Sequence, residues 1–262
     1  EQFTSSTEGA LYHALGDELS AYVESYSFTS LAETLLRRYG GAAVPTLSEA
    51  GRAVLVRRAM DEMMDKVVYY SRQRRSAAFC QKAAETISEL KSAGIRPETL
   101  ADYANAHGAD KDKLGELALI FGTYETLLAQ TAMDPGDRQQ RAAERLDAEF
   151  FAGRAVFIDE FDTFNAPKKR LMGAMLAALP AVTVALCEDG APMQPGDLEL
   201  FSGAKQVAAQ LRQLARKNGA QVAAPELLRR DLRHKDAPGL AALTELLETG
   251  SCTPPESAPE LR

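Results

Sequence analysis

Between about residues 46 and 150, apolar residues recur every three or four positions, and this periodicity constrains the fold more than any other feature of the sequence. One predicted helical face carries, in order, Ala53, Val56, Met60, Met63, Val67 and Tyr70. Two further stripes are Phe79, Ala83, Ile87, Leu90 and Leu114, Leu117, Phe121, Tyr124, Leu128. Thr46 and Glu49 have the spacing of a capping box, Gly94 is placed to end a helix, and Asp134-Pro135 to start one. The segment predicts a bundle of roughly four or five helices.

The periodicity changes after residue 154. Ala155–Ile158 is a short apolar run, which predicts a buried parallel strand, and Val182–Leu186 is a second one. A helix predicted at Pro167–Leu179 lies between them, so the three elements should form a right-handed βαβ unit. Further helices are predicted at about 203–217 and 238–248, with a brief extended piece near 221–222.

The first 40 residues predict a smaller α/β piece. It contains a helix over Ser5–Leu15, an extended stretch at Ala21–Ser27, and a second helix to Arg38 that Ser27 or Thr29 can cap. We therefore expect an α/β fold with a parallel sheet shared by residues 1–40 and 152–250, interrupted by an inserted all-helical domain at 41–151. Residues 251–262 have the composition of a linker, and both ends suggest a segment cut from a longer chain.

Charge and cysteine content exclude some classes of function. A net charge of −7 over 262 residues argues against tight DNA binding by the chain as a whole. Cys80, Cys187 and Cys252 are far apart, and neither a Cys-x-x-Cys pair nor a Cys/His cluster occurs, which indicates a reducing cytoplasm and no metal site of that kind. No signal peptide and no apolar run of about 18 residues is present.

The residues after the first predicted strand carry the sharpest chemical signal. Four apolar positions followed by Asp159-Glu160 are typical of a Walker B strand, whose Asp holds Mg²⁺ through water and whose Glu orients the attacking water. A strand that merely ends in an acidic turn has the same pattern. No Gly-x-x-x-x-Gly-Lys-Ser/Thr loop occurs, so nothing here offsets the charge of a triphosphate. We expect Asp159 to bind Mg²⁺ only where such a loop is supplied, and no ATP hydrolysis by this chain alone.

Asp159-Glu160-Phe161-Asp162-Thr163 resembles motif II of superfamily 1 helicases of the UvrD and RecB type, Asp-Glu-Phe-Gln-Asp-Thr, but is one residue shorter and lacks the Gln that senses the γ-phosphate. Several segments, read in order, are similar to AddB-type subunits of the AddAB helicase–nuclease. They are Glu1–Thr4, Glu24–Ala32, Leu47–Arg52, Ile87–Lys91, Lys113–Phe121 and Phe157–Phe164. Asn165-Ala166-Pro167-Lys168-Lys169 departs from the family, which often continues Phe-Thr-Pro-Gln-Glu.

The resemblance implies a degenerate helicase-like fragment of the B subunit of an ATP-dependent exonuclease that processes double-strand DNA ends for recombinational repair. Residues 1–40 and 152–250 would be its helicase-like domain without the P-loop strand, and 41–151 its inserted domain. An AddA-type helicase–nuclease subunit, DNA ends and single-stranded DNA are the implied partners, and no membrane. ATP with Mg²⁺ would belong to the parent protein, as would an iron–sulfur cluster in a C-terminal nuclease domain outside this chain.

Three groups are candidates for DNA contact. Arg72, Arg74 and Arg75 lie among aromatic residues, as in single-strand grooves, although a solvated helix end beside core aromatics has the same pattern. Lys168, Lys169 and Arg170 begin a helix, where cations are disfavoured unless an anion is near. Phe3 and Thr4 are candidates by analogy with a helicase motif. The alternatives are a stand-alone Walker-B-type ATPase and a non-catalytic helical scaffold that binds protein partners.

Overall fold

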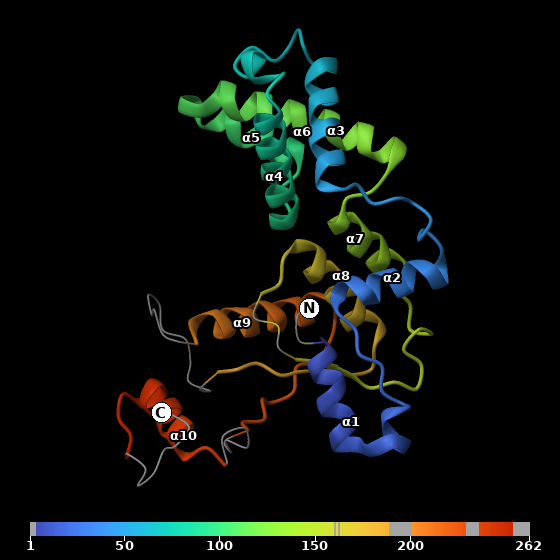
Figure 1. Ribbon diagram of the computed structural model, residues 1–262, viewed down its shortest axis with the longest axis vertical. Helices are drawn as coiled ribbons and strands as arrows, with labels where there is room; N and C mark the ends of the chain where they lie inside the picture. Colours follow the sequence, from blue (N-terminus) through green and yellow to red (C-terminus); the bar gives the residue numbers. More distant parts are fainter. Residues whose placement is uncertain (1–3, 160, 162, 189–200, 229–235, 254–262) are drawn as a thin grey trace. The chain divides into compact units, whose positions relative to one another are not determined.

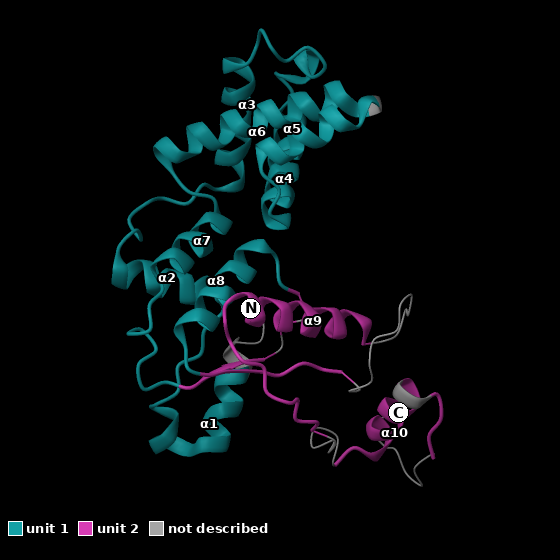
Figure 2. Ribbon diagram, turned by 180° about the vertical axis from the view of Figure 1, so that it is seen from behind, with its two compact units in different colours: residues 1–154, 164–180 teal, residues 155–163, 181–262 magenta. Residues whose placement is uncertain are grey.

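The computed structural model describes residues 4–159, 161, 163–188, 201–228 and 236–253. The chain divides into two compact units, coloured separately in Figure 2. Unit 1 comprises Glu1–Arg154 and Phe164–Pro180, and unit 2 comprises Ala155–Thr163 and Ala181–Arg262. The domain boundaries expected from the sequence, at 1–40, 41–151, 152–250 and 251–262, stay a prediction.

Unit 1 is built from helices (Figure 1). They are α1 (Thr4–Ser20), α2 (Phe28–Tyr39), α3 (Glu49–Glu62), α4 (Ala77–Ala93), α5 (Pro97–Ala106), α6 (Lys111–Thr131), α7 (Pro135–Arg145) and α8 (Ala166–Ala178), with short 3₁₀ turns η1 (Ser71–Gln73) and η2 (Gly108–Asp110). The extended stretch expected at Ala21–Ser27 forms no strand, since no neighbouring strand in the described part of the unit pairs with it. The predicted cap of α2 is confirmed at Ser27, whose hydroxyl oxygen accepts a hydrogen bond from the backbone N–H of Ser30 at 3.0 Å.

Helices α3 to α6 enclose the main core of unit 1. The predicted stripes supply much of it: the largest side chains with under 2% exposure include Val56, Met60, Ile87, Phe121 and Tyr124. Ile120, equally buried, was not in a predicted stripe. Two local expectations were wrong. Helix α3 ends at Glu62, so Val67 and Tyr70 reach the core from the following loop rather than from the same helical face. The capping box at Thr46 is absent, because Ser48 immediately precedes the helix and binds the N–H of Gly51 at 3.1 Å.

Helices α2, α7 and α8 pack together beside this core, with α7 between the other two. The buried Arg138 of α7 holds α2 and the segment that follows it. Its guanidinium donates to the carboxylate of Glu33 at 2.8 Å and to the carbonyl oxygen of Val44 at 2.8 Å. The start of α7 is as predicted, with Asp134 as the N-cap and its backbone N–H bound by the Asp137 carboxylate at 3.2 Å.

Unit 2 contains a two-stranded parallel sheet. Strand β1 (Val156–Ile158) pairs with β2 (Val182–Val184), Val156 opposite Val182, and the predicted order of strand, helix and strand is confirmed. Helices α9 (Ser202–Lys217) and α10 (Pro238–Thr249) follow, and residues 221–222 form no strand. The prediction that this strand is buried holds for one face only. Ile158 is 6% exposed, but Phe157 on the opposite face is 74% exposed.

The chain is therefore mostly helical, with a small parallel sheet as its α/β element. Within the described residues both strands come from 152–250 and residues 4–40 add none, so the sheet shared by 1–40 and 152–250 stays a prediction. No helix among the described residues is long and apolar enough to cross a membrane.

A substitution at Gly94 tests how closely α4 packs against α8. Gly94 has φ of +79°, as the left-handed C-cap of α4, and a Cβ at this position would lie 3.0 Å from the Cβ of Ala166. We expect Gly94→Ala to lower the free energy of unfolding by about 1–2 kcal/mol, because the conformation and the contact are both unfavourable for alanine. Gly115→Ala, inside α6 with open space around it, should instead raise it by about 0.5–1 kcal/mol. Urea unfolding followed by circular dichroism measures both, and equal effects would contradict this account.

Candidate functional site

The end of β1 is where the sequence places a nucleotide-type site. Asp159 directly follows the buried Ile158, whose carbonyl oxygen accepts a hydrogen bond from the N–H of Ala185 at 2.8 Å. Asp159 is exposed, at the carboxyl end of a parallel strand as expected. Glu160 lies outside the described residues. The structure thus places one of the two Walker-B-like carboxylates, and the Mg²⁺ role of Asp159 stays a prediction.

The residues present do not make a complete site for either implied cofactor. The sequence has no phosphate-binding loop to complement Asp159, and among the described residues no group of three or more His, Cys, Asp or Glu side chains could hold a metal ion. An iron–sulfur cluster takes about four thiolates, whereas this chain has three cysteines. Of these, Cys80 is buried in the core of α3 to α6, where burial raises the pKa of its thiol.

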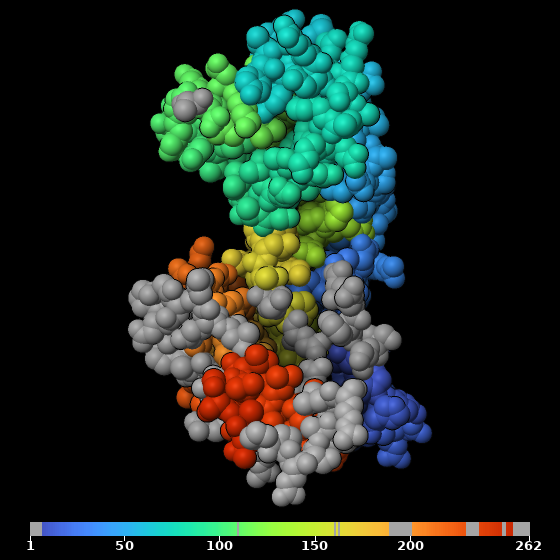
Figure 3. Space-filling view, turned by 60° about the vertical axis from the view of Figure 1, so that its left-hand side comes forward, coloured from blue at the N-terminus to red at the C-terminus, as the bar shows by residue number. Residues whose placement is uncertain are grey.

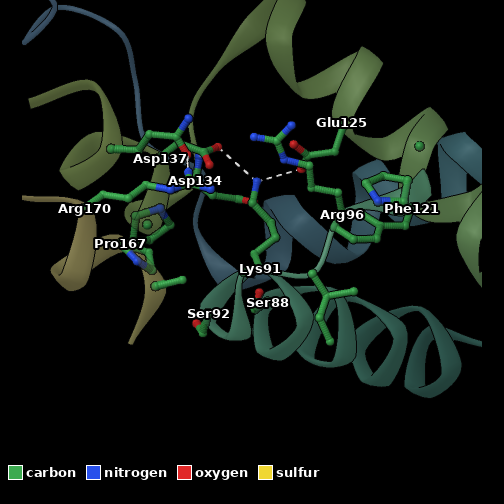
Figure 4. A pocket seen from close by; sticks show the side chains of 18 of the residues that line it. Ser88, Lys91, Ser92, Arg96, Phe121, Glu125, Asp134, Asp137, Pro167 and Arg170 are labelled. Carbon is green, nitrogen blue, oxygen red and sulfur yellow. Dashed lines mark hydrogen bonds and ion pairs between the residues drawn. The ribbon is translucent and has the colours of Figure 1, made fainter. Parts of the chain in front are cut away.

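A cavity of about 530 Å³ lies in unit 1 among α4, α5, α6, α7 and α8 (Figure 4). Lys91 projects from α4 toward acidic side chains at one side of it. Its Nζ lies 2.6 Å from the Glu125 carboxylate, 2.8 Å from that of Asp134 and 3.0 Å from that of Asp137. The hydroxyl of Tyr124 donates to the other oxygen of Asp134 at 2.7 Å. We call these five residues the Lys91 cluster.

Burial and neighbouring charges together set the protonation of the Lys91 cluster. Desolvation by itself would lower the pKa of Lys91, but Asp134 and the other two carboxylates outweigh it and raise the pKa above its ordinary value. Burial, followed by the charge of Asp134, raises the pKa of Tyr124, and burial raises that of Glu125. The ammonium and the phenol therefore keep their protons at neutral pH. Such a cluster can join three helices, but it presents no activated nucleophile.

The rest of the cavity carries charges of both signs. Arg52, Arg96 and Arg170 line it together with Glu98 and the acidic members of the Lys91 cluster. Because the lining contains both cations and anions, its charge does not select one class of ligand. We assign the cavity no ligand.

The three arginines at residues 72–75 differ in their surroundings. Arg74 forms an ion pair with Asp61 at 3.3 Å, whereas Arg72 and Arg75 are exposed and form no ion pair within the described part of the chain. The aromatic residues divide in the same way. Tyr70 and Phe79 pack against the core, as the alternative interpretation held, but Tyr69 is 54% exposed.

The other candidate DNA contacts lie in α8 and at the start of the chain. The N–H of Lys168 is bound by Asn165 at 3.0 Å, and its ammonium lies 5.9 Å from the ring centroid of Phe28. Lys169 is half-buried, and Arg170 donates to the side-chain oxygen of Gln140. Thr4 is the first residue of α1, and Phe3 lies outside the described residues. None of these contacts tests DNA binding, which stays a prediction for this group.

Buried charges were missed by the sequence interpretation. Lys91 follows the buried Ile87 by four positions, and Glu116 precedes the buried Ile120 by four. Each charge is therefore in phase with an apolar stripe, which places it on the buried face of its helix. A charge in such a position needs a buried partner, and this was the available signal.

Removing Lys91 tests whether the cluster holds the helices together. Lys91→Met should lower the free energy of unfolding by about 2–4 kcal/mol, because it leaves the buried Asp134 and the partly exposed Glu125 and Asp137 without their cation. The control is Lys82→Met, which removes the exposed pair with Glu85 at 3.1 Å on the same helix. We expect that change to cost less than about 0.5 kcal/mol. Denaturant unfolding of both variants decides the matter, and similar losses would show that the cluster contributes no more than a surface pair.

The raised pKa values in the Lys91 cluster predict that the folded chain loses stability at alkaline pH. Folding raises the pKa of Lys91 and of Tyr124, so their stabilisation is complete below the unfolded values of about 10.4 and 10 and is lost as the pH rises through the folded values. The unfolding midpoint should therefore fall from about pH 10 upward. Lys91→Met should show a shallower fall across the same range, measured by thermal unfolding at a series of pH values. A parallel decline of both proteins would assign the alkaline loss to other groups.

Comparisons with known proteins agree with the resemblance seen in the sequence. The family model described as "ADDB, N-terminal" matches residues 1–244. A protein of Moorella thermoacetica, named as the B subunit of an ATP-dependent helicase/deoxyribonuclease, is 32% identical over 254 residues, which cover 93% of this chain and 22% of that protein. The protein of the same name from Desulforudis audaxviator is 31% identical, with 93% and 22% covered, and that of Acetivibrio thermocellus is 26% identical, with 94% and 22%. The chain thus spans 22% of the length of these relatives, and it belongs to the ADDB N-terminal family.

Proposed function

We propose that this chain is the N-terminal piece of the B subunit of an ATP-dependent helicase–exonuclease, and that it guides DNA rather than performing chemistry. The observation that carries the proposal is the family match over residues 1–244, joined to relatives named as helicase/deoxyribonuclease subunits. In this proposal the complete enzyme processes double-strand DNA ends for recombinational repair. An AddA-type subunit supplies the motor, and ATP with Mg²⁺ and an iron–sulfur cluster are bound elsewhere in the assembly.

Two features of the chain favour guidance over catalysis. Asp159 stands at the end of a short sheet in a sequence without a phosphate-binding loop, so half of a nucleotide site is missing. The same absence counts against a stand-alone ATPase. Arg72 and Arg75, in contrast, are exposed and outside any described ion pair, which leaves their charges available to phosphate groups. A helical scaffold for proteins is the second candidate, favoured by the buried Lys91 cluster that fixes α4, α6 and α7.

DNA binding without nucleotide is the central test. With a fluorescein-labelled single-stranded oligonucleotide, anisotropy should give a dissociation constant of about 1–100 μM near physiological salt, the range of non-specific binding. Binding should weaken steeply as salt rises and should not change when ATP and Mg²⁺ are added. Phosphate release from ATP should be absent in the chain and in its Asp159→Asn variant alike.

Two results would overturn the proposal. Micromolar ATP binding or turnover that Asp159→Asn abolishes would indicate an autonomous ATPase. A chain that shows no binding to single-stranded DNA at about 50 mM salt, where phosphate contacts are at their strongest, would favour the protein scaffold.

A further inference from the structure

A buried carboxylate organises the loop between α3 and α4, the segment 63–76, which we call the Glu116 loop. The two oxygens of Glu116 accept hydrogen bonds from three successive backbone N–H groups, those of Val68 at 2.8 Å, Tyr69 at 2.6 Å and Tyr70 at 3.0 Å. Glu116 lies on α6 and is only 8% exposed. Figure 3 shows the loop, in cyan, at the surface at the top of the view.

This arrangement fixes the loop in one conformation. Hydrogen bonds to an ionised carboxylate are about twice as strong as neutral ones, and three of them offset the cost of burying Glu116. Successive N–H groups that converge on one anion also define the local backbone closely. As a result Val67 points into the core, at 3% exposure, while Val68 and Tyr69 are held outward at 76% and 54%.

The outward Tyr69 ring is braced from within the loop. It meets the ring of Tyr70 edge to face at 4.8 Å, and Tyr70 packs on Phe79 of α4 at 5.0 Å. Tyr70 and Phe79 are themselves packed against the core of α3 to α6. An aromatic ring that is already positioned loses little conformational entropy when a partner stacks on it.

The loop is locally basic although the chain is acidic. It contains four cations, Lys66, Arg72, Arg74 and Arg75, and one anion, Asp65, in a chain of net charge −7. Arg74 forms an ion pair with Asp61, whereas Arg72 and Arg75 of the same loop are exposed. A loop that carries an exposed ring and two exposed guanidinium groups suits a partner that has both flat bases and phosphates.

We propose that the Glu116 loop binds single-stranded DNA, with one base stacked on Tyr69 and the neighbouring phosphates bound by Arg72 and Arg75. Glu116 is a positioning residue that acts through the loop backbone. The inference rests on the proposed DNA-guiding function and assigns it to one surface. A duplex offers no exposed base face to Tyr69, and the excess of cations matches a nucleic acid better than an apolar protein surface.

Substitutions at Tyr69 test the stacking contact. Tyr69→Ala should weaken binding of a labelled oligothymidine about 5- to 150-fold, while Tyr69→Phe should stay within about twofold of the parent. Tyr103→Ala is the matched control, since Tyr103 is 52% exposed on α5, outside the loop. Arg72→Ala together with Arg75→Ala should lower the slope of log affinity against log salt by about 1.4.

Fluorescence distinguishes stacking from a general loss of structure. The chain contains no tryptophan, so Tyr69→Trp introduces a unique fluorophore. Its emission should be quenched by oligothymidine, and that of Tyr103→Trp should not. Adding Glu116→Gln to Tyr69→Trp should reduce both the quenching and the affinity, because the amide offers the three N–H groups one acceptor oxygen instead of two charged ones. Circular dichroism of the same samples should show an unchanged helix content.

The outcomes separate this surface from the proposed function. If the chain binds single-stranded DNA but Tyr69→Ala and the double arginine variant bind as the parent does, the surface is wrong and the guiding function stands. If the chain binds none, the proposed function fails first. An emission change of Tyr69→Trp that follows the concentration of the chain, and not that of DNA, would show that a second copy covers the loop and would overturn the assignment.

Discussion

The ion pairs of the Lys91 ammonium are the interactions on which the arrangement of α4, α6 and α7 depends. The ammonium joins α4 to α6 through Glu125 and to the start of α7 through Asp134 and Asp137, all within 3.0 Å. Because the buried Asp134 shares this cation with the partly exposed Glu125 and Asp137, loss of the cation should destabilise the cluster. Further along α7, Arg138 forms an ion pair with Glu33 and so joins α2 to α7. Polar contacts thus join α7 to α2, α4 and α6, beside the apolar core of α3 to α6.

Helix α6 connects the Lys91 cluster to the exposed Glu116 loop. Glu116 lies eight residues before Tyr124, which corresponds to about 12 Å along a helix. One end of α6 is fixed by the Lys91 cluster, and the other holds the Glu116 loop through three N–H groups. The backbone of Tyr69 is thus held by Glu116 while its side chain stays exposed. Preorganisation of this kind favours the strand binding proposed for the loop, since the strand alone then has to be ordered.

The sequence predicted what local patterns control and missed what distant partners control. Apolar spacing located α3, α4 and α6, and Asp134-Pro135 correctly started α7. The three- and four-residue spacing continued through Val67 and Tyr70, however, so it could not show that α3 stops at Glu62. Glu116 bonds to residues 46 to 48 positions away, and no local motif marks such a partner. Likewise the apolar run at β1 predicted a strand but not its exposed face at Phe157, because burial of a strand depends on what packs against it.

The proposed DNA-guiding function draws on unit 1 rather than on unit 2. A nucleotide-hydrolysing core of parallel strands needs cover on both faces and a phosphate loop beside its acidic strand. Unit 2 shows two short paired strands with Phe157 exposed, and the sequence supplies no such loop. Unit 1, in contrast, holds an aromatic and two arginine side chains outward on a backbone fixed by a buried carboxylate. The proposed holding of a strand requires only such a fixed surface, whereas hydrolysis would require a complete site.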